Sequence, residues 1–77
     1  MRGFKTARSV YYIDTTTTSR LIWGGKLGNT PRRYAPGAQF IIGNPGIAYF
    51  VDSYDRQLYT SDGRPAMIQT GIIREYI

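Results

Sequence analysis

Apolar and polar residues alternate over short stretches of this 77-residue chain, and a period of two is typical of half-buried β-strands. No stretch has the i, i+3, i+4, i+7 spacing of apolar residues that an amphipathic helix needs. Tyr, Ile and Thr, which favour strands, are abundant throughout. The pattern predicts strands at residues 9–14, 18–23, 38–42, 47–52, 57–60 and 66–76, and Gly71 is where the last of them can break at little cost.

Turn-forming residues separate these stretches. Asp14 and the threonines after it can close a hairpin through side-chain to backbone hydrogen bonds. Pro and Gly within residues 43–46 suit a tight turn, and Asp62 followed by Gly63 is a strong hairpin signal. Strands with turns about every 8–12 residues predict an all-β fold, a small and mostly antiparallel barrel or sandwich of about five to seven short strands.

The chain is long enough for one small domain, which we expect to span residues 1–77. So small a domain buries only about 60% of its unfolded surface, and its core is modest. No Cys is present to form disulfides or thiolate metal sites, and no His is present to serve as a metal ligand or general base. We therefore expect no cofactor and no metal, and we expect a homo-oligomer that adds buried surface.

Two segments resemble each other at an offset of 38 residues, because Tyr-Tyr-Ile-Asp at 11–14 is echoed by Tyr-Phe-Val-Asp at 49–52. A period near 40 residues is found in repeat architectures. Residues 44–63 resemble a propeller-blade repeat, which two units could close into a ring only by oligomerising. The alternative, which the use of common turn residues favours, is that two unrelated hairpin pairs share the same local chemistry.

The charge is basic and unevenly distributed. Ten Lys and Arg face five Asp and Glu, for a net +5. Residues 1–40 carry seven cations against one acid, whereas residues 41–77 carry three cations against four acids. The first half is therefore +6 and the second half −1, which indicates one anion-seeking face, although a few extra charges can serve solubility alone.

Residues 24–37 show no strand pattern, and irregular loops of this length are often functional. Arg32, Arg33 and Tyr34 lie there between two prolines that stiffen the loop, and Arg beside an aromatic ring suits single-stranded nucleic acid or a protein hot spot. A solvated connection between two halves of the fold is the alternative. The predicted interface consists of Arg2, Lys5, Arg8, Arg20, Lys26, Arg32, Arg33 and Tyr34.

Adjacent aromatic residues supply a second binding signal. Tyr11 and Tyr12 must point to opposite faces of a strand, and so must Tyr49 and Phe50. One ring of each pair is then exposed, where it can stack on a base or enter a partner's pocket, unless another layer covers both faces. The C-terminal residues 72–77 are apolar and β-prone; as an edge strand they would invite pairing between copies, but a central position is favoured.

Catalysis has little support in the sequence. Each carboxylate is explained by a turn or strand end, no His is present to activate a hydroxyl, and Gly24-Gly25-Lys26 lacks the spacing of a phosphate-binding loop. No apolar run approaches the about 20 residues of a spanning helix, and no apolar segment follows the N-terminal charges. We therefore expect a cytoplasmic, membrane-independent and non-enzymatic module.

The most favoured partner is an anion, with nucleic acid first and an acidic protein surface second. The alternative function is a protein-interaction module, such as a phage or mobile-element inhibitor of a host protein, or a structural piece of an assembly.

Overall fold

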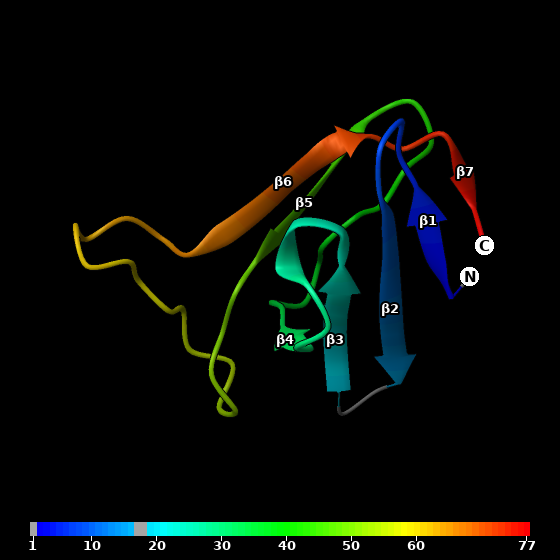
Figure 1. The fold of residues 1–77 in the computed structure, drawn as a ribbon. Helices are drawn as coiled ribbons and strands as arrows, with labels where there is room; N and C mark the ends of the chain where they lie inside the picture. Colours follow the sequence, from blue (N-terminus) through cyan, green and yellow to red (C-terminus); the bar gives the residue numbers. More distant parts are fainter. Residues whose placement is uncertain (1, 17–18) are drawn as a thin grey trace.

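The computed structural model describes residues 2–16 and 19–77 (Figure 1). Five antiparallel strands form one sheet in the order β4-β3-β2-β1-β7, and β5 and β6 form a separate antiparallel ribbon. The predicted all-β class is confirmed, and of its two variants the sandwich is right, because the two sheets pack face to face without closing a barrel. The elements are β1 (Gly3–Lys5), β2 (Val10–Thr16), β3 (Ser19–Gly24), the short 3-10 turn η1 (Gly25–Leu27), β4 (Arg32–Arg33), β5 (Pro45–Tyr49), β6 (Met67–Ile72) and β7 (Glu75–Tyr76).

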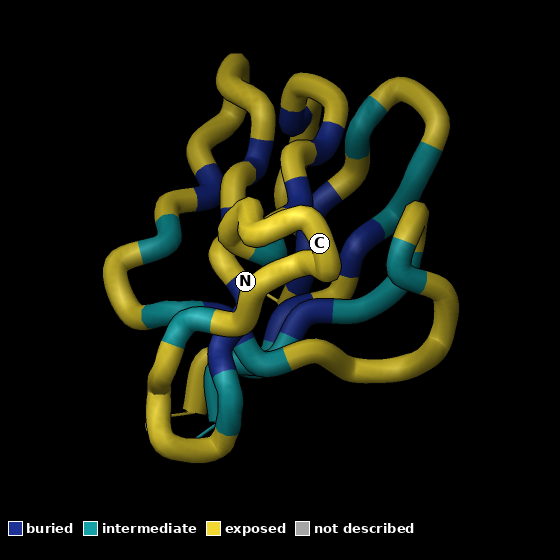
Figure 2. The backbone as a smooth tube through the Cα atoms, turned by 90° about the vertical axis from the view of Figure 1, so that its left-hand side faces the viewer, coloured by how far each residue is buried: buried dark blue, intermediate teal, exposed yellow. Residues whose placement is uncertain are grey.

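The hydrophobic core lies between the sheet and the ribbon. Alternation along the strands sends every second side chain inward, and Figure 2 shows buried and exposed positions alternating along the chain. The ring of Phe4 stacks on Tyr11 and on Phe40, each with centroids 5.3 Å apart. The core is made of Phe4, Tyr11, Ile13, Ile22, Tyr34, Phe40, Ala48, Phe50, Ile68 and Ile73. As predicted, one ring of each adjacent aromatic pair is exposed: the structure exposes Tyr12 and Tyr49 and buries Tyr11 and Phe50.

Two predicted strands do not form as such. Residues 38–42 run without ladder pairing, although Phe40 is buried, so the apolar pattern there reflects a buried coil. Residues 57–60 make only isolated bridges, from Gln57 to Val51 and from Tyr59 to Pro65. The predicted strand 66–76 divides after Ile72 and not at Gly71, giving β6 and β7. Side-chain pattern alone cannot distinguish a paired strand from an extended coil.

Two short strands were not expected. β1 and β4 have too few residues to show alternation, and β4 lies inside the 24–37 segment that the sequence predicts to be irregular. That segment also contains η1, so it is only partly irregular. Arg33 pairs with Leu21 and Arg32 with Ile22, which makes β4 the edge strand beside β3.

The turn predicted at Gly63 is confirmed, and the turn predicted at residues 43–46 gives its last two residues to β5. Gly63 has φ +85° in a closed turn from Thr60 to Arg64, as its Asp-Gly signal indicates. Asp14 accepts a hydrogen bond from the backbone of Thr16 near the β2–β3 hairpin, whose residues 17–18 lie outside the described residues. Gly46 belongs to β5 rather than to the turn before it. A Cβ there would approach Phe40 and Phe4 to 3.2 and 3.3 Å, so a glycine lets the ribbon lie close to the core.

The two similar segments have different surroundings. In residues 11–14 the first Tyr is buried within the five-stranded sheet, whereas in residues 49–52 the first Tyr is exposed on β5. Residues 44–63 contain one strand and isolated bridges instead of the four strands of a propeller blade. The resemblance therefore does not extend to the fold.

The C-terminal residues are an edge strand and not a central one. β7 pairs with β1 alone, and backbone hydrogen bonds between Arg2 and Ile77 and between Ile77 and Gly3 fasten it there. Among the residues that the structure describes, no helix is long and apolar enough to cross a membrane.

Candidate nucleic-acid interface

One face of the five-stranded sheet looks away from the core and carries both rings and charges. The strand register puts Tyr12 opposite Trp23, and Leu21 between Asp14 and Arg33. Cross-strand partners share a face, so these side chains lie on one side of the sheet. We call this side the outer face, and its members are Lys5, Tyr12, Asp14, Leu21, Trp23 and Arg33.

An aromatic pair occupies the middle of the outer face. The rings of Tyr12 and Trp23 are stacked with centroids 5.9 Å apart and planes at 23°. Tyr12 is 42% exposed, whereas Tyr11 beside it is 1% exposed and belongs to the core. The two rings line a shallow hollow of about 400 Å³ together with Arg2 and Asp14. The outer face thus carries a stacked aromatic pair with Arg2 next to it.

Two of the predicted arginines meet at the β4 edge of the sheet. Arg20 on β3 and Arg33 on β4 both bind one carboxylate oxygen of Asp55, and the Arg33 Nε is 3.1 Å from it. These hydrogen bonds, that of Arg20 foremost, hold the pKa of Asp55 below its ordinary value against a smaller opposing effect of desolvation. Arg20 also donates to the carbonyl of Tyr34 at 3.1 Å, so its guanidinium is fixed on two sides.

Two further arginines complete this edge. The guanidinium of Arg32 lies 4.1 Å above the buried ring of Phe50, while Arg32 itself is exposed. Arg56 lies 5.7 Å from the ring of Tyr54, which is 78% exposed. We call this group the arginine edge, and its members are Arg20, Arg32, Arg33, Asp55 and Arg56.

Asp52 shapes the loop that carries Asp55. Its carboxylate accepts backbone hydrogen bonds from Tyr54 at 2.8 Å and from Arg56 at 3.0 Å. Asp55 has φ +61°, a left-handed conformation that few non-glycine residues adopt. The ion pairs with Arg20 and Arg33 hold this loop against the sheet edge.

The other predicted cations do not join this cluster. Lys5 lies 3.4 Å from Glu75 at the opposite, β7 edge of the sheet. Lys26, in η1, donates to the carbonyl of Gln69 at 3.3 Å and so ties η1 to β6. Arg8 is exposed in the β1–β2 turn, and Arg2 lies beside the aromatic pair. The first-half cations are thus divided among several places.

Tyr34 has a different position from the one expected. Its ring is 4% exposed and meets Phe40 edge-on at 5.7 Å, so it is a core residue and is not available to stack on a base. Burial raises the pKa of its hydroxyl. The reason is the bridge that pairs Tyr34 with Phe50, which turns the side chain inward.

Sequence reasoning missed two of the five members of the arginine edge. Asp55 and Arg56 belong to the near-neutral second half, and only the folded chain brings them to β4. Tyr54 and Trp23 were not singled out either. For Trp23 the alternation of β3 was a usable signal, because it puts Trp23 on the face opposite Ile22.

Comparisons with protein-family models, curated proteins and solved structures gave no match. Stacked exposed rings bind flat π-systems, and adjacent guanidinium groups bind phosphate or carboxylate oxygens. The carboxylate of Asp14 lies in the hollow and would repel a phosphate bound there. An anionic ligand would therefore place its charges at the sides of the aromatic pair.

Proposed function

We propose that the protein binds single-stranded nucleic acid across the outer face. Bases stack on Tyr12 and Trp23, and phosphates contact Arg2 on one side of the rings and the arginine edge on the other. The observation that carries the proposal is the ring of Tyr12, exposed on a sheet face and stacked on the half-buried Trp23, with Arg2 beside the pair. Sheet-borne aromatic rings flanked by cations are the usual means of binding unpaired bases.

The rings favour nucleic acid over an acidic protein surface. Carboxylates of a protein partner would use the guanidinium groups but would leave the aromatic pair without a matching group. Bases use both, since stacking is worth about 1–3 kcal/mol per base. Because Asp14 repels phosphate, the rings and not the charges determine where the ligand crosses the sheet.

The test uses the fluorescence of Trp23, the one tryptophan of the chain. An oligothymidylate of about 12 nucleotides, a length within the usual site sizes, is titrated into the protein at several salt concentrations. We expect quenching of Trp23 and a log Kd that rises with log salt, at a slope of about 0.7 per phosphate contacted. An abasic oligomer of equal length should bind more weakly and leave the fluorescence unchanged.

A matched pair of charge reversals locates the contact. Arg2→Glu is expected to weaken binding about tenfold at low salt and to lower the salt slope by about one. Arg64→Glu changes the net charge equally, but Arg64 lies in the Thr60–Arg64 turn and pairs with Asp62 at 3.3 Å. Equal losses in both variants would show a response to net charge alone, and unquenched Trp23 would remove the outer face as the site.

A further inference from the structure

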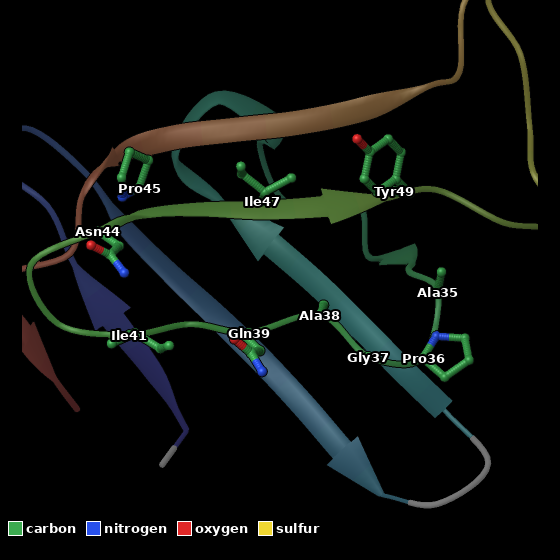
Figure 3. Close-up of a pocket in the computed structure, with 10 residues that line it drawn as sticks. All are labelled: Ala35, Pro36, Gly37, Ala38, Gln39, Ile41, Asn44, Pro45, Ile47 and Tyr49. Atoms are coloured by element: carbon green, nitrogen blue, oxygen red, sulfur yellow. The ribbon is translucent and has the colours of Figure 1, made fainter.

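A second site lies on the other half of the molecule, in a groove of about 530 Å³ between β5 and residues 35–41 (Figure 3). Its apolar lining includes Ala38, Ile41, Ile47 and Tyr49, and no charged side chain lines it. It shares no residue with the outer face or the arginine edge. Its volume lies within the range of about 300–1,000 Å³ that is usual for ligand pockets. Each of its two long sides is formed by one extended chain segment.

The edge of β5 points its peptide groups into this groove. The backbone N–H of Phe50 donates to the carbonyl of Ala66 at 2.9 Å, and the backbone N–H of Gly46 donates to the Thr70 hydroxyl at 2.9 Å. The peptide groups of the even-numbered residues of this segment therefore point toward β6. Antiparallel pairing alternates, so the N–H and C=O of Ile47 and Tyr49 point the other way. The hydrogen bond from Ala35 to the Tyr49 carbonyl, at 2.8 Å, confirms this direction.

The ladder on that edge ends after one bridge. Tyr34 pairs with Phe50, but the chain then turns away at Pro36 and Gly37, which has φ +90°. Within the part of the chain that the structure describes, no backbone bond reaches the N–H or C=O of Ile47 from this side. An open strand edge of this kind is a template for another extended chain.

The facing wall has the sequence of a strand and lacks a strand's partner. Residues 38–42 alternate as a strand does, yet they form no ladder in the described structure. Figure 3 shows Ala38, Gln39 and Ile41 on a segment that follows β5 across the groove. One added strand between the two walls would give β5 a partner and would offer this segment one as well.

We propose that the groove binds an extended, uncharged segment of another protein by β-strand addition. Backbone hydrogen bonds to the N–H and C=O of Ile47 and to the N–H of Tyr49, whose C=O already accepts from Ala35, supply the attachment, and alternate apolar side chains of the guest enter the neutral lining. A second copy of β5 does not fit, because its own edge is flanked by its own residues 35–41. The occupant is therefore a single peptide segment from a partner. This inference does not rest on nucleic-acid binding.

The first experiment titrates the ¹⁵N-labelled protein with an acetylated and amidated peptide of about six alternating Val and Thr residues. We expect the largest amide shifts at Ile47 and Tyr49, together with slower hydrogen exchange of the Ile47 amide when peptide is bound. Two alternately N-methylated peptides each block one backbone edge, and at least one of them must fail to bind. No shift at up to about 1 mM peptide, or shifts elsewhere only, would overturn the proposal.

The matched variants are Ile47→Asp and Ile72→Asp. Both side chains are exposed, at 40% and 57%, but only Ile47 lines the groove. We expect Ile47→Asp to weaken peptide binding at least about tenfold, because a carboxylate is desolvated under the guest, whereas Ile72→Asp binds as the parent does. If Ile47→Asp loses its folded spectrum, Ile41→Asp on the facing wall replaces it.

Three results would contradict the proposal that the groove binds a peptide by β-strand addition. Equal affinity of Ile47→Asp and Ile72→Asp would show that the peptide lies elsewhere. Binding of both N-methylated peptides would show that the attachment is not a backbone ladder. Protection of the Ile47 amide that grows with protein concentration, without peptide, would identify a second copy as the occupant.

Discussion

The outer face and the groove differ in what they offer a ligand. The outer face presents the rings of Tyr12 and Trp23 with guanidinium groups at its sides. The groove presents backbone N–H and C=O groups between uncharged walls. The comparison shows that one small core can support two surfaces of opposite character, one suited to a flat and charged polymer and the other to a neutral extended chain.

The two surfaces also differ in how they are held. The arginine edge is fixed by ion pairs with Asp55 across long sequence separations. The groove is fixed by packing, because Phe40 and Ala48 anchor its two walls in the core. Conditions that weaken ion pairs should therefore affect the first surface before the second.

The largest effect is expected for Phe4→Ala, which tests whether the surfaces share one foundation. Phe4 is fully buried and stacks on Tyr11, next to Tyr12, and on Phe40, next to Ile41. Truncation of a buried Phe costs about 3–5 kcal/mol, a large part of the stability of a small domain. Urea unfolding should show that loss, and both binding activities should fall together; loss of only one would show that the surfaces are independent.

Trp23→Leu separates the surfaces. It removes the larger ring of the stacked pair, so oligonucleotide affinity should fall by about 1–3 kcal/mol, or about 5- to 150-fold. Binding is measured by anisotropy of a labelled oligonucleotide, since the intrinsic signal is lost. Peptide binding in the groove should not change. An unchanged oligonucleotide affinity would mean that no base stacks on this face.

Gly37→Ala acts on the groove alone. Gly37 has φ +90°, and a Cβ there would meet no atom within 4 Å, so only the backbone conformation opposes the change. We expect a loss of about 1 kcal/mol in unfolding free energy, because alanine disfavours a positive φ. We also expect a weaker peptide complex, because the turn that holds the groove open is then less stable. Gly63→Ala is the control, with φ +85° and equally open space, and should cost similar stability without touching peptide binding.

The smallest effect is expected for Asp55→Asn and concerns how the free energy of unfolding falls at acid pH. The folded pKa of Asp55 is lowered by Arg20 and Arg33, so its ion pairs contribute stability above the unfolded pKa. That contribution disappears as the pH falls through the lower, folded pKa. Asp55→Asn should therefore flatten the pH dependence of unfolding in the acid range and leave stability near neutrality only slightly changed. A parallel acid limb in the variant would show that the ion pairs do not form in solution.

Much of the fold could be predicted because alternation reports burial directly. The pairing of β2 with β3, the opposite directions of Tyr11 and Tyr12, and the Gly63 turn follow from local pattern and turn chemistry. The strand predicted at 38–42 failed because an apolar period does not say whether a ladder partner exists. β4 is too short for any period to reveal it.

The candidate site could be predicted only in part. The charge of each residue can be read from the sequence, but which distant charges the fold brings together cannot. Arg20 and Arg33 were singled out by composition, but Asp55, which joins them, is distant in sequence and of the opposite sign. Tyr34 failed as a stacking residue because proximity to Arg in sequence says nothing about side-chain direction. Lys26 failed as a cluster member because η1 carries it to β6.

The most direct measurement is a ¹⁵N–¹H titration of one sample with the oligothymidylate. The proposed function predicts that the largest shifts fall on Tyr12, the Trp23 indole N–H and Arg2, while the amides of Ile47 and Tyr49 stay in place. Shifts confined to the groove, or spread evenly over every exposed cation, would contradict it.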